Sequence, residues 1–414
     1  MMMRAAVGLW VLSAVICVGR GHDHHLDHDD DKTIQDTVVD GSANSVSLVT
    51  EANQEFSFRL YRKLAADADS QGKNIFFSPA SVSTALAALS VGAQGETHRQ
   101  LFSGLGFNSS LLTQTDVDQA FQMFLQRANN TSQDTSEGTA VFVDNRFKPK
   151  PEFLQTLKQS YFTDGFNVDF SNDTESADTI NKYVEGKTNG KIDQLVEDLD
   201  PNTVMYLISY IYYKGKWVTP FDRELTKQDD FNVDENTKVS VDMMNMKNDF
   251  YTYLDHKLNT TVLQLPFKSS YSMLLMLPDA MATLENAISP NHITKWLKAM
   301  MRPRKHYVYL PKFSIKTPYN LNDVLSEMGM TDMFGDRANL RGISEEQRLA
   351  VSDVVHQATL DVDETGAEAS AATAILIMPA PVPVLKFNRP FMVIITERKT
   401  EKILFLGKII NPTT

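Results

Sequence analysis

The sequence predicts an α+β fold, in which helices pack on large, mostly antiparallel β-sheets. Ala52, Phe56, Leu60 and Leu64 recur every four residues, as the apolar face of an amphipathic helix does. The run 204–213 is apolar and rich in β-branched and aromatic residues, which favours a strand that is covered on both faces. Shorter runs of the same type predict strands at 262–265, 273–277, 307–310, 391–396 and 403–405.

The segment after the first helix predicts a short strand that leads into a buried helix. Residues 74–77 read Asn-Ile-Phe-Phe. Ser78 then offers a helix cap, and Pro79 stands at a first helical position that tolerates proline. No charged residue occurs from 75 to 95, as in a membrane span. The serines within this stretch favour a core helix instead.

Length and composition fit a single globular domain over residues 48–414. The chain has 414 residues, of which 42% are apolar and 22% charged, and these shares are ordinary for a globular protein. No repeat period and no Pro/Gly-rich linker divides it. The net charge of −12 argues against a nucleic-acid-binding protein. We expect a monomer with no cofactor and no bound metal.

The amino terminus predicts a secretory signal peptide over residues 1–21. A short basic start ends at Arg4, an apolar stretch follows over residues 5–18, and small residues stand at Gly19 and Gly21. Cleavage is expected after Gly21, with Gly19 as the alternative. The apolar stretch is too short to span a membrane, so we expect a secreted, extracellular protein.

Residues 22–47 are predicted to form a disordered tail, because they include few large apolar residues. The first part of the tail holds four of the nine histidines of the chain. His24 and His28 would share a helical face that could bind Zn²⁺. A solvated acidic tail is the alternative, and the composition favours it.

The mature chain is expected to lack cysteine, because the single cysteine, Cys17, lies in the signal peptide. Its stability must then come from the core alone. Five Asn-x-Ser/Thr sequons support export and predict glycosylation at Asn108, Asn129, Asn130, Asn172 and Asn259. Two of these sequons, at 129 and 130, overlap, so at most one of the two is expected to be modified.

The sequence predicts a protein that is not an enzyme. Gly186-Lys187-Thr188 resembles the end of a phosphate-binding loop, but Asn181 stands where the first glycine belongs. The chain has no Gly-x-Ser-x-Gly motif. The histidines outside the tail are scattered, and no pattern nominates a catalytic triad.

The most informative segment lies near the carboxy terminus. Residues 364–374 read Glu-Thr-Gly-Ala-Glu-Ala-Ser-Ala-Ala-Thr-Ala, a run of small residues between two ordered segments. Gly366 permits a backbone bend, and alternate side chains of a strand share one face. The positions that would share a face all carry small side chains: Ala367, Ala369, Ala371 and Thr373. Such a run can enter a β-sheet, and a flexible surface linker is the alternative.

Several motifs, in order and at matching spacing, resemble those of the serpin family, and in particular its α1-antitrypsin clade. Residues 74–79 resemble the family's shutter segment, and residues 179–185 and 188–192 resemble its helix-F region. The run Lys-Gly-Lys-Trp at 214–217 resembles the segment that places a buried tryptophan below the reactive loop. Residues 385–395 resemble the carboxy-terminal signature. The resemblance covers nearly the whole predicted domain and implies the serpin fold.

The resemblance also implies inhibition of serine proteases by a conformational trap. The protease attacks an exposed loop and becomes acylated. The cleaved loop then inserts into the central sheet, and the protease is distorted before water can release it. The hinge of that loop corresponds to Glu364, Gly366, Ala367, Glu368, Ala369, Ser370, Ala371 and Ala372. A non-inhibitory serpin that carries small molecules is the alternative.

Counting seventeen residues from the hinge glutamate, as in the family, places the reactive bond at Ala380-Pro381. A proline after the scissile bond normally blocks serine proteases, because it lacks an N–H and stiffens the chain. Cleavage between residues 376 and 378 is the alternative, and it would shorten the inserted strand. No Arg or Lys lies between Glu364 and Leu385. Elastase-like or chymotrypsin-like proteases are therefore expected targets, rather than trypsin-like ones.

Two further groups of residues follow from the resemblance. The polar shutter and the tryptophan below the loop correspond to Ser78, Ser81, Ser209, His356 and Trp217. Serine at position 209 replaces the family's asparagine, which predicts an altered hydrogen-bond network. Some relatives bind heparin through a basic helix, and the corresponding residues are Lys295, Lys298, Arg302, Arg304 and Lys305. A solvated helix end is the alternative for this basic group.

Overall fold

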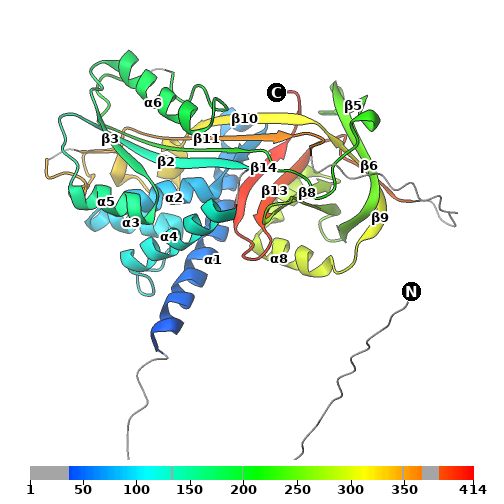
Figure 1. Cartoon of the computed structure of the whole chain (residues 1–414), viewed down its shortest axis with the longest axis horizontal. Coiled ribbons are helices and arrows are strands. Elements are labelled where there is room, and N and C mark those ends of the chain that lie inside the picture. Colours follow the sequence, from blue (N-terminus) through cyan, green and yellow to red (C-terminus); the bar gives the residue numbers. More distant parts are fainter. Residues whose placement is uncertain (1–36, 132–133, 198, 347–348, 366–381) are drawn as a thin grey trace, which may run out of the picture.

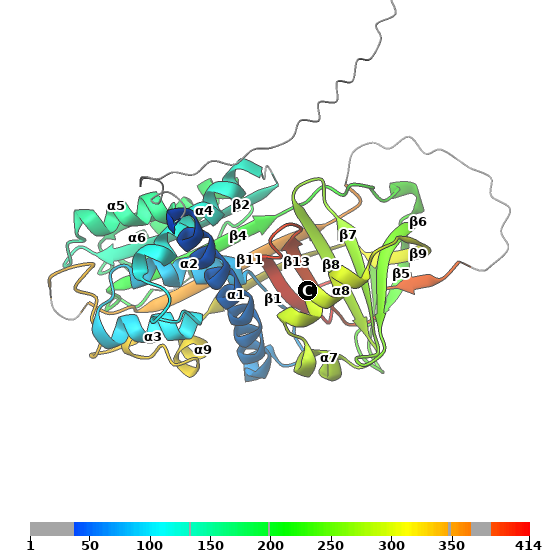
Figure 2. The ribbon, with the colours of Figure 1, turned by 90° about the horizontal axis from the view of Figure 1, so that it is seen from below.

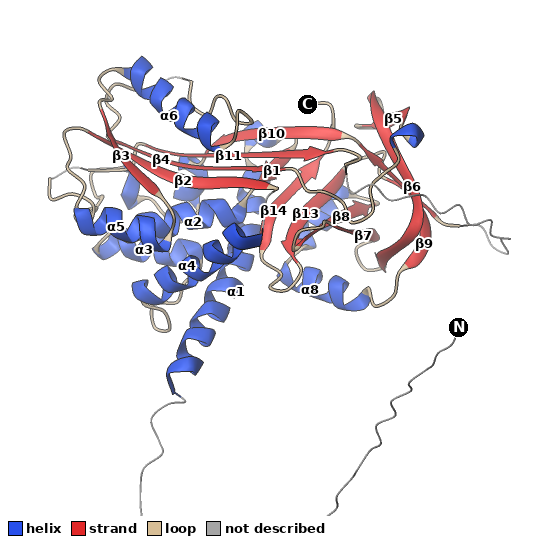
Figure 3. Ribbon diagram, viewed as in Figure 1, coloured by secondary structure: helices blue, strands red, loops and turns tan. Residues whose placement is uncertain are grey.

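The chain folds into two β-sheets with helices packed against them, as Figures 1 and 3 show. This computed structural model describes residues 37–131, 134–197, 199–346, 349–365 and 382–414. The arrangement confirms the predicted α+β class. The strands predicted from short apolar runs are all present.

The smaller sheet has five strands in the order β10-β11-β4-β2-β3 within the described residues. These strands are β2 (Thr135–Asp144), β3 (Asp164–Val168), β4 (Met205–Tyr213), β10 (Phe313–Asn320) and β11 (Asp353–Val362). The inner strands β4 and β11 run parallel to each other, while their other neighbours, β2 and β10, are antiparallel to them. Every residue of β4 is buried, as predicted for a strand covered on both faces.

The larger sheet follows the order β1-β14-β13-β8-β7-β6-β9-β12, with β5 paired to β6. Its strands are β1 (Ile75–Phe77), β5 (Lys227–Asn232), β6 (Lys238–Asp255), β7 (Thr260–Pro266), β8 (Tyr271–Pro278), β9 (Arg304–Pro311), β12 (Val384–Lys386), β13 (Phe391–Glu397) and β14 (Ile403–Ile409). The long strand β6 pairs with β9 up to Phe250 and with β7 from Tyr251 onward. β6 therefore changes its hydrogen-bonded partner strand between these two residues.

Helices lie on both faces of the five-stranded sheet and beside the larger sheet. The helices of the described residues are α1 (Thr37–Ala66), α2 (Pro79–Ser90), α3 (Gly95–Leu105), α4 (Gln114–Thr131), α5 (Pro151–Ser160), α6 (Asp173–Lys187), α7 (Met281–Ala287), α8 (Pro290–Ala299) and α9 (Asn322–Glu327). Short 3₁₀ turns occupy Ala68–Ser70, Arg223–Leu225 and Asp332–Phe334. Figure 1 shows α6 on one face of the sheet and α2, α4 and α5 on the other. Figure 2 shows α7 and α8 beside the larger sheet.

The start of α2 follows the predicted chemistry. The Ser78 side chain accepts a hydrogen bond from the backbone N–H of Ser81, and Pro79 occupies the first helical position. Every residue of α2 is buried. The uncharged stretch is therefore a core helix, as the sequence predicts, and no helix in the described residues is long and apolar enough to cross a membrane.

The start of α1 corrects one prediction. The helix begins at Thr37, well before the predicted domain boundary at Leu48. Val46 and Leu48 pack against the main core, and the Ser45 hydroxyl donates to the Asp116 carboxylate at 3.3 Å. Residues 37–47 are therefore helical, where the sequence predicts a disordered tail. Composition alone missed residues 45–47 because Ser45 and Val46 are held by contacts with Asp116 of α4 and with the core, and those contacts leave no local pattern.

Candidate functional site

The parallel pair of β4 and β11, here called the seam, lies at the centre of the candidate site. The two strands are in register from Tyr206 opposite Asp353 to Tyr213 opposite Leu360. Beyond β11 the chain continues to Thr365, and residues 366–381 lie outside the described residues. A segment that follows β11 and turns back would run antiparallel to both strands of the seam. Antiparallel pairs are slightly more stable per residue than parallel ones, so the seam is suited to accept such a strand.

A buried polar network fastens the middle of the seam. His356 on β11 stands directly opposite Ser209 on β4. The Nδ1 atom of His356 lies 2.8 Å from the Ser209 hydroxyl, and its Nε2 atom lies 3.0 Å from the backbone nitrogen of Ser78. The Ser78 hydroxyl in turn accepts the backbone N–H of Ser81 at 3.1 Å. All four residues are buried, so the network joins both strands of the seam to the start of α2.

The network determines the protonation state of His356. A backbone N–H can only donate, so Nε2 must be an unprotonated acceptor. Nδ1 then carries the proton and donates it to the Ser209 hydroxyl. Burial lowers the pKa of His356 from 6.5 to about 3, although the bond to Ser209 opposes this. The side chain is therefore neutral at physiological pH.

A buried tryptophan holds the end of β11 where the undescribed loop begins. The indole Nε1–H of Trp217 donates to the backbone O of Asp363 at 2.7 Å, and its backbone N–H donates to the backbone O of Thr365 at 3.1 Å. The indole ring stacks on Phe267 with centroids 4.4 Å apart. Trp217 is only 3% exposed. The tryptophan thus fixes the last described residues before the loop.

Two acidic residues before the loop are held by lysines. Glu364, only 5% exposed, accepts from the Thr226 hydroxyl at 2.9 Å and lies 3.2 Å from Lys312 Nζ. Asp363 lies 2.7 Å from Lys214 Nζ. Burial raises the pKa of each carboxyl, but hydrogen bonds and the neighbouring lysine outweigh that effect and hold both pKa values below their usual range. Both groups are therefore charged at neutral pH, and they clamp the hinge.

The comparisons with known proteins agree with this geometry. The family model "Serpin (serine protease inhibitor)" matches residues 51–412. The chain is a serpin. It is 40% identical over 412 residues to an alpha-1-antitrypsin-like protein of Tamias sibiricus, with 98% of each chain covered. The predicted family and clade are confirmed.

Solved structures share the fold of this serpin. Human kallistatin is 36% identical, with a TM-score of 0.83, over 89% of this chain and 99% of its own. Human thyroxine-binding globulin, solved in complex with its thyroxine ligand, is 35% identical with the same TM-score, over 89% of this chain and 100% of its own. The serpin fold predicted by resemblance is therefore confirmed.

The five predicted shutter and tryptophan residues lie in two separate groups along the seam. Ser78, Ser81, Ser209 and His356 form one network, while Trp217 lies apart, at the end of the seam next to the loop. The bond from His356 to Ser209 is present at 2.8 Å. Serine at position 209 therefore still bridges the seam.

Several predicted residues lie outside the described part of this serpin. Of the hinge, only Glu364 is described, and the remainder falls within 366–381 together with the predicted reactive bond Ala380-Pro381. The predicted signal peptide, residues 1–21, and the first part of the tail also lie outside it. Their roles remain predictions.

The predicted surface sites occupy separate regions. Asn108, Asn172 and Asn259 are exposed, while Asn129 and Asn130 belong to the last turn of α4. Among the basic residues, Lys295 and Lys298 lie on α8, Arg302 follows that helix, and Arg304 and Lys305 begin β9. All five are exposed. Lys295 is also paired, at 2.8 Å, with the buried carboxylate of Asp255.

The sequence reasoning missed the partners that clamp the hinge. Thr226 lies 138 residues before Glu364 in the chain, and Lys312 belongs to the turn between β9 and β10. No local pattern links such residues. The only available signal was the unusual placement of two adjacent acidic residues, Asp363 and Glu364, directly after a buried strand.

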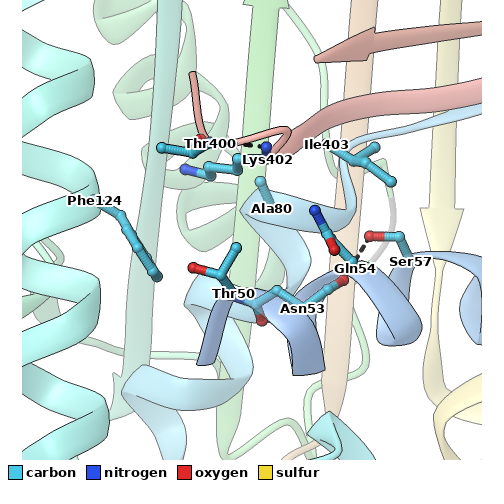
Figure 4. A pocket seen from close by; sticks show the side chains of 9 residues that line it. All are labelled: Thr50, Asn53, Gln54, Ser57, Ala80, Phe124, Thr400, Lys402 and Ile403. Carbon is cyan, nitrogen blue, oxygen red and sulfur yellow. Dashed lines mark hydrogen bonds between the residues drawn. The ribbon is translucent and has the colours of Figure 1, made fainter. Parts of the chain in front are cut away.

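A small pocket of about 20 Å³ lies between α1, α4 and the turn that joins β13 to β14 (Figure 4). Its lining residues are Thr50, Asn53, Gln54, Ser57, Ala80, Phe124, Thr400, Lys402 and Ile403. The Lys402 Nζ atom lies 5.8 Å from the centre of the Phe124 ring. Gln54 donates to the backbone O of Glu401 at 3.3 Å. The pocket offers hydrogen-bonding groups, an aromatic face and one positive charge.

Proposed function

We propose that this serpin is a secreted inhibitor that traps serine proteases by inserting its cleaved loop into the seam. The observation that carries the proposal is the parallel pairing of β4 and β11. β11 continues toward the loop through a hinge that Trp217 and Lys312 hold. The small side chains at alternate positions, Ala367, Ala369, Ala371 and Thr373, suit an inserted strand, because they need little space in the core.

Insertion is favourable in this geometry for a simple reason. The loop replaces one parallel ladder by two antiparallel ladders, so the sheet gains a strand and its hydrogen bonds. The ion pair between Lys214 and Asp363 and the bond between His356 and Ser209 resist the opening of the seam. The intact chain is then held in a higher-energy form until a protease cuts the loop. The protease supplies the nucleophile, and the inhibitor supplies the strain.

The composition of the loop sets the proposed targets. Without Arg or Lys between Glu364 and Leu385, the loop suits elastase-like or chymotrypsin-like enzymes, whose pockets take small or apolar side chains. Pro381 disfavours cleavage at Ala380-Pro381. The mass of the released carboxy-terminal fragment would identify the bond that is cut.

The test is incubation with elastase, chymotrypsin and trypsin, followed by denaturing electrophoresis. We expect a stable band of summed mass with elastase or chymotrypsin and less with trypsin. Ala367→Arg should convert the inhibitor into a substrate, because a guanidinium in the inserted strand is costly to bury. Leu111→Arg, at a surface position that is 59% exposed, is the matched control and should trap normally. Efficient trapping by Ala367→Arg would contradict the insertion mechanism.

Export, glycosylation and heparin binding belong to the same proposal. The apolar amino terminus supports secretion, and the exposed asparagines 108, 172 and 259 can accept glycans. The exposed cations Lys298, Arg302, Arg304 and Lys305 form a basic surface that can bind a sulfated polysaccharide weakly. The double variant Lys298→Gln/Arg302→Gln should then bind heparin more weakly than the wild type does.

A carrier role is the second candidate, and the pocket of Figure 4 is the observation that favours it. Thyroxine-binding globulin, which shares this fold, was solved with thyroxine. The carboxylate of a ligand such as thyroxine would match the charge of Lys402, and its aromatic ring would match Phe124. Saturable thyroxine binding that Lys402→Glu abolishes, together with no protease trapping, would favour the carrier role.

A further inference from the structure

A second cavity, here called the Trp217 cavity, lies where β6 changes partners. β6 pairs with β9 up to Phe250 and with β7 from Tyr251 onward. A cavity of about 90 Å³, partly open to solvent, lies beside β6 at this point. Trp217 lines it, together with residues of β6 and the end of β7. The cavity therefore adjoins the place where β6 changes its partner strand.

The inner walls of the cavity are aromatic and already fixed. Trp217, Phe221 and Phe250 are at most 6% exposed, and Leu265 is 4% exposed. The Trp217 and Phe221 rings pack edge to face, with their centroids 6.1 Å apart. Tyr251, at 39% exposed, stands nearer the solvent. These walls are therefore formed before any ligand binds, as in most ligand sites.

The rim of the cavity carries a single charged residue, the exposed carboxylate of Asp249. Within the described residues Asp249 makes no ion pair, although Lys305 stands opposite it across the pair of β6 and β9. Gln264, half-buried beside it, supplies an amide. No lysine or arginine lines the cavity. The charge and the walls together fit an aromatic ring that bears a protonated amine.

We propose that the Trp217 cavity is a binding site for aromatic amines. The ring would lie against Trp217, Phe221 and Phe250, and the ammonium group would reach the Asp249 carboxylate. This site is separate from the pocket of Figure 4, which is lined by other residues and carries the opposite charge.

The cavity is coupled to the hinge through Trp217. One side of the indole lines the cavity, while its Nε1–H holds the backbone O of Asp363 and its backbone N–H holds that of Thr365. A ligand that contacts Trp217 stabilises the arrangement in which these bonds are made. Such a ligand shifts the population toward the closed hinge. This second step rests on the proposed function, and it should slow loop insertion after cleavage.

The site is tested by calorimetric titration of the full chain with naphthylmethylamine and, as the matched anion, naphthylacetate. We expect the amine to bind at least about tenfold more tightly than the acetate, because a charge-assisted hydrogen bond is formed only by the amine. Asp249→Asn should abolish that preference, and Thr219→Trp should block binding by filling the mouth. Both positions are exposed, so both variants should fold. Asp242→Asn, an exposed carboxylate on the same strand, is the control and should bind like the wild type.

Equal binding of amine and acetate, or full binding by Thr219→Trp, would overturn the site. The coupling is read separately, from the ratio of trapped complex to cleaved inhibitor with and without the amine. Binding that leaves this ratio unchanged would overturn the coupling and leave the site intact. If the wild type traps no protease at all, the proposed function fails, while the titration still decides the site.

Discussion

The seam between β4 and β11 is fastened in two different ways along its length. In its middle, the neutral His356 bonds to Ser209 and Ser78 and is fully buried. At the end next to the loop, the fastening is ionic: Lys214, which follows β4 and is 41% exposed at its side chain, holds Asp363, which follows β11. The difference indicates where opening begins. Water and salt weaken the ion pair next to the loop first. The middle of the seam opens only when its hydrogen bonds are broken.

The largest effect is expected at the middle of the seam. His356→Leu leaves the Ser78 N–H and the Ser209 hydroxyl buried without partners, and each such group costs about 1–3 kcal/mol. We expect the free energy of unfolding in urea to fall by about 2–5 kcal/mol. His256→Leu, at an exposed histidine, is the control and should change it by less than about 0.5 kcal/mol. Equal effects of the two substitutions would mean that the network does not fasten the seam.

The second prediction concerns pH. His356 has a folded pKa of about 3 and an ordinary value of 6.5, so between these values the unfolded chain binds more protons than the folded one. Stability is therefore complete above pH 6.5 and falls as the pH drops toward 3. Between pH 7 and pH 5, this linkage predicts that the free energy of unfolding falls by about 2 kcal/mol.

The measurement is urea unfolding at both pH values for the wild type and His356→Gln. The fall in the free energy of unfolding should be smaller in the variant by that same amount, about 2 kcal/mol, because the variant lacks the titrating imidazole. The hinge carboxyls lose their contribution only at lower pH, because their pKa values are depressed. An identical pH dependence in the two proteins would contradict a neutral, buried His356.

At the loop end a smaller effect is expected, and it should depend on salt. A double-mutant cycle of Asp363→Asn and Lys214→Met should give a coupling energy of about 0.5–1 kcal/mol at low salt, since Lys214 is partly exposed. At about 1 M NaCl most of that coupling should vanish. The effect of His356→Leu should change little with salt. A salt-insensitive coupling at Asp363 would remove the contrast between the two fastenings.

The smallest effect is expected on the opposite face of β11. Gln357 is fully buried, and neither atom of its carboxamide has a protein partner in the described residues. Gln357→Met removes these polar atoms at similar volume, so the free energy of unfolding should rise by up to about 1 kcal/mol. Thermal unfolding of the intact chain measures this. A clear loss of stability would show that Gln357 is satisfied, for example by bound water.

The sequence predicts elements well where one local pattern decides them. The uncharged stretch after Ser78 is the buried helix α2, and the apolar run 204–213 is β4. β6 was not predicted, because its exposed and buried residues follow no regular alternation where it changes partners. The start of α1 was missed because the contact of Ser45 with Asp116 of α4 is long-range and leaves no local pattern.

The site was predictable only through resemblance to a family. His356 by itself is one of several scattered histidines, and no spacing connects it to Ser78 or Ser209. The partners of the hinge, Lys312 and Thr226, were not predicted at all, because distant strands bring them to Glu364. Long-range contacts of this kind are set by the sheet topology, which local patterns do not encode.

The most direct test of the account is thermal unfolding before and after a single cut within residues 366–381. Cutting a loop normally lowers the stability of a protein or leaves it unchanged, because the chain gains freedom. If the loop enters the seam, the cleaved protein must melt well above the intact one, and cleaved Ala367→Arg must show a smaller rise. A cleaved wild type that melts at or below the temperature of the intact chain would contradict insertion into the seam.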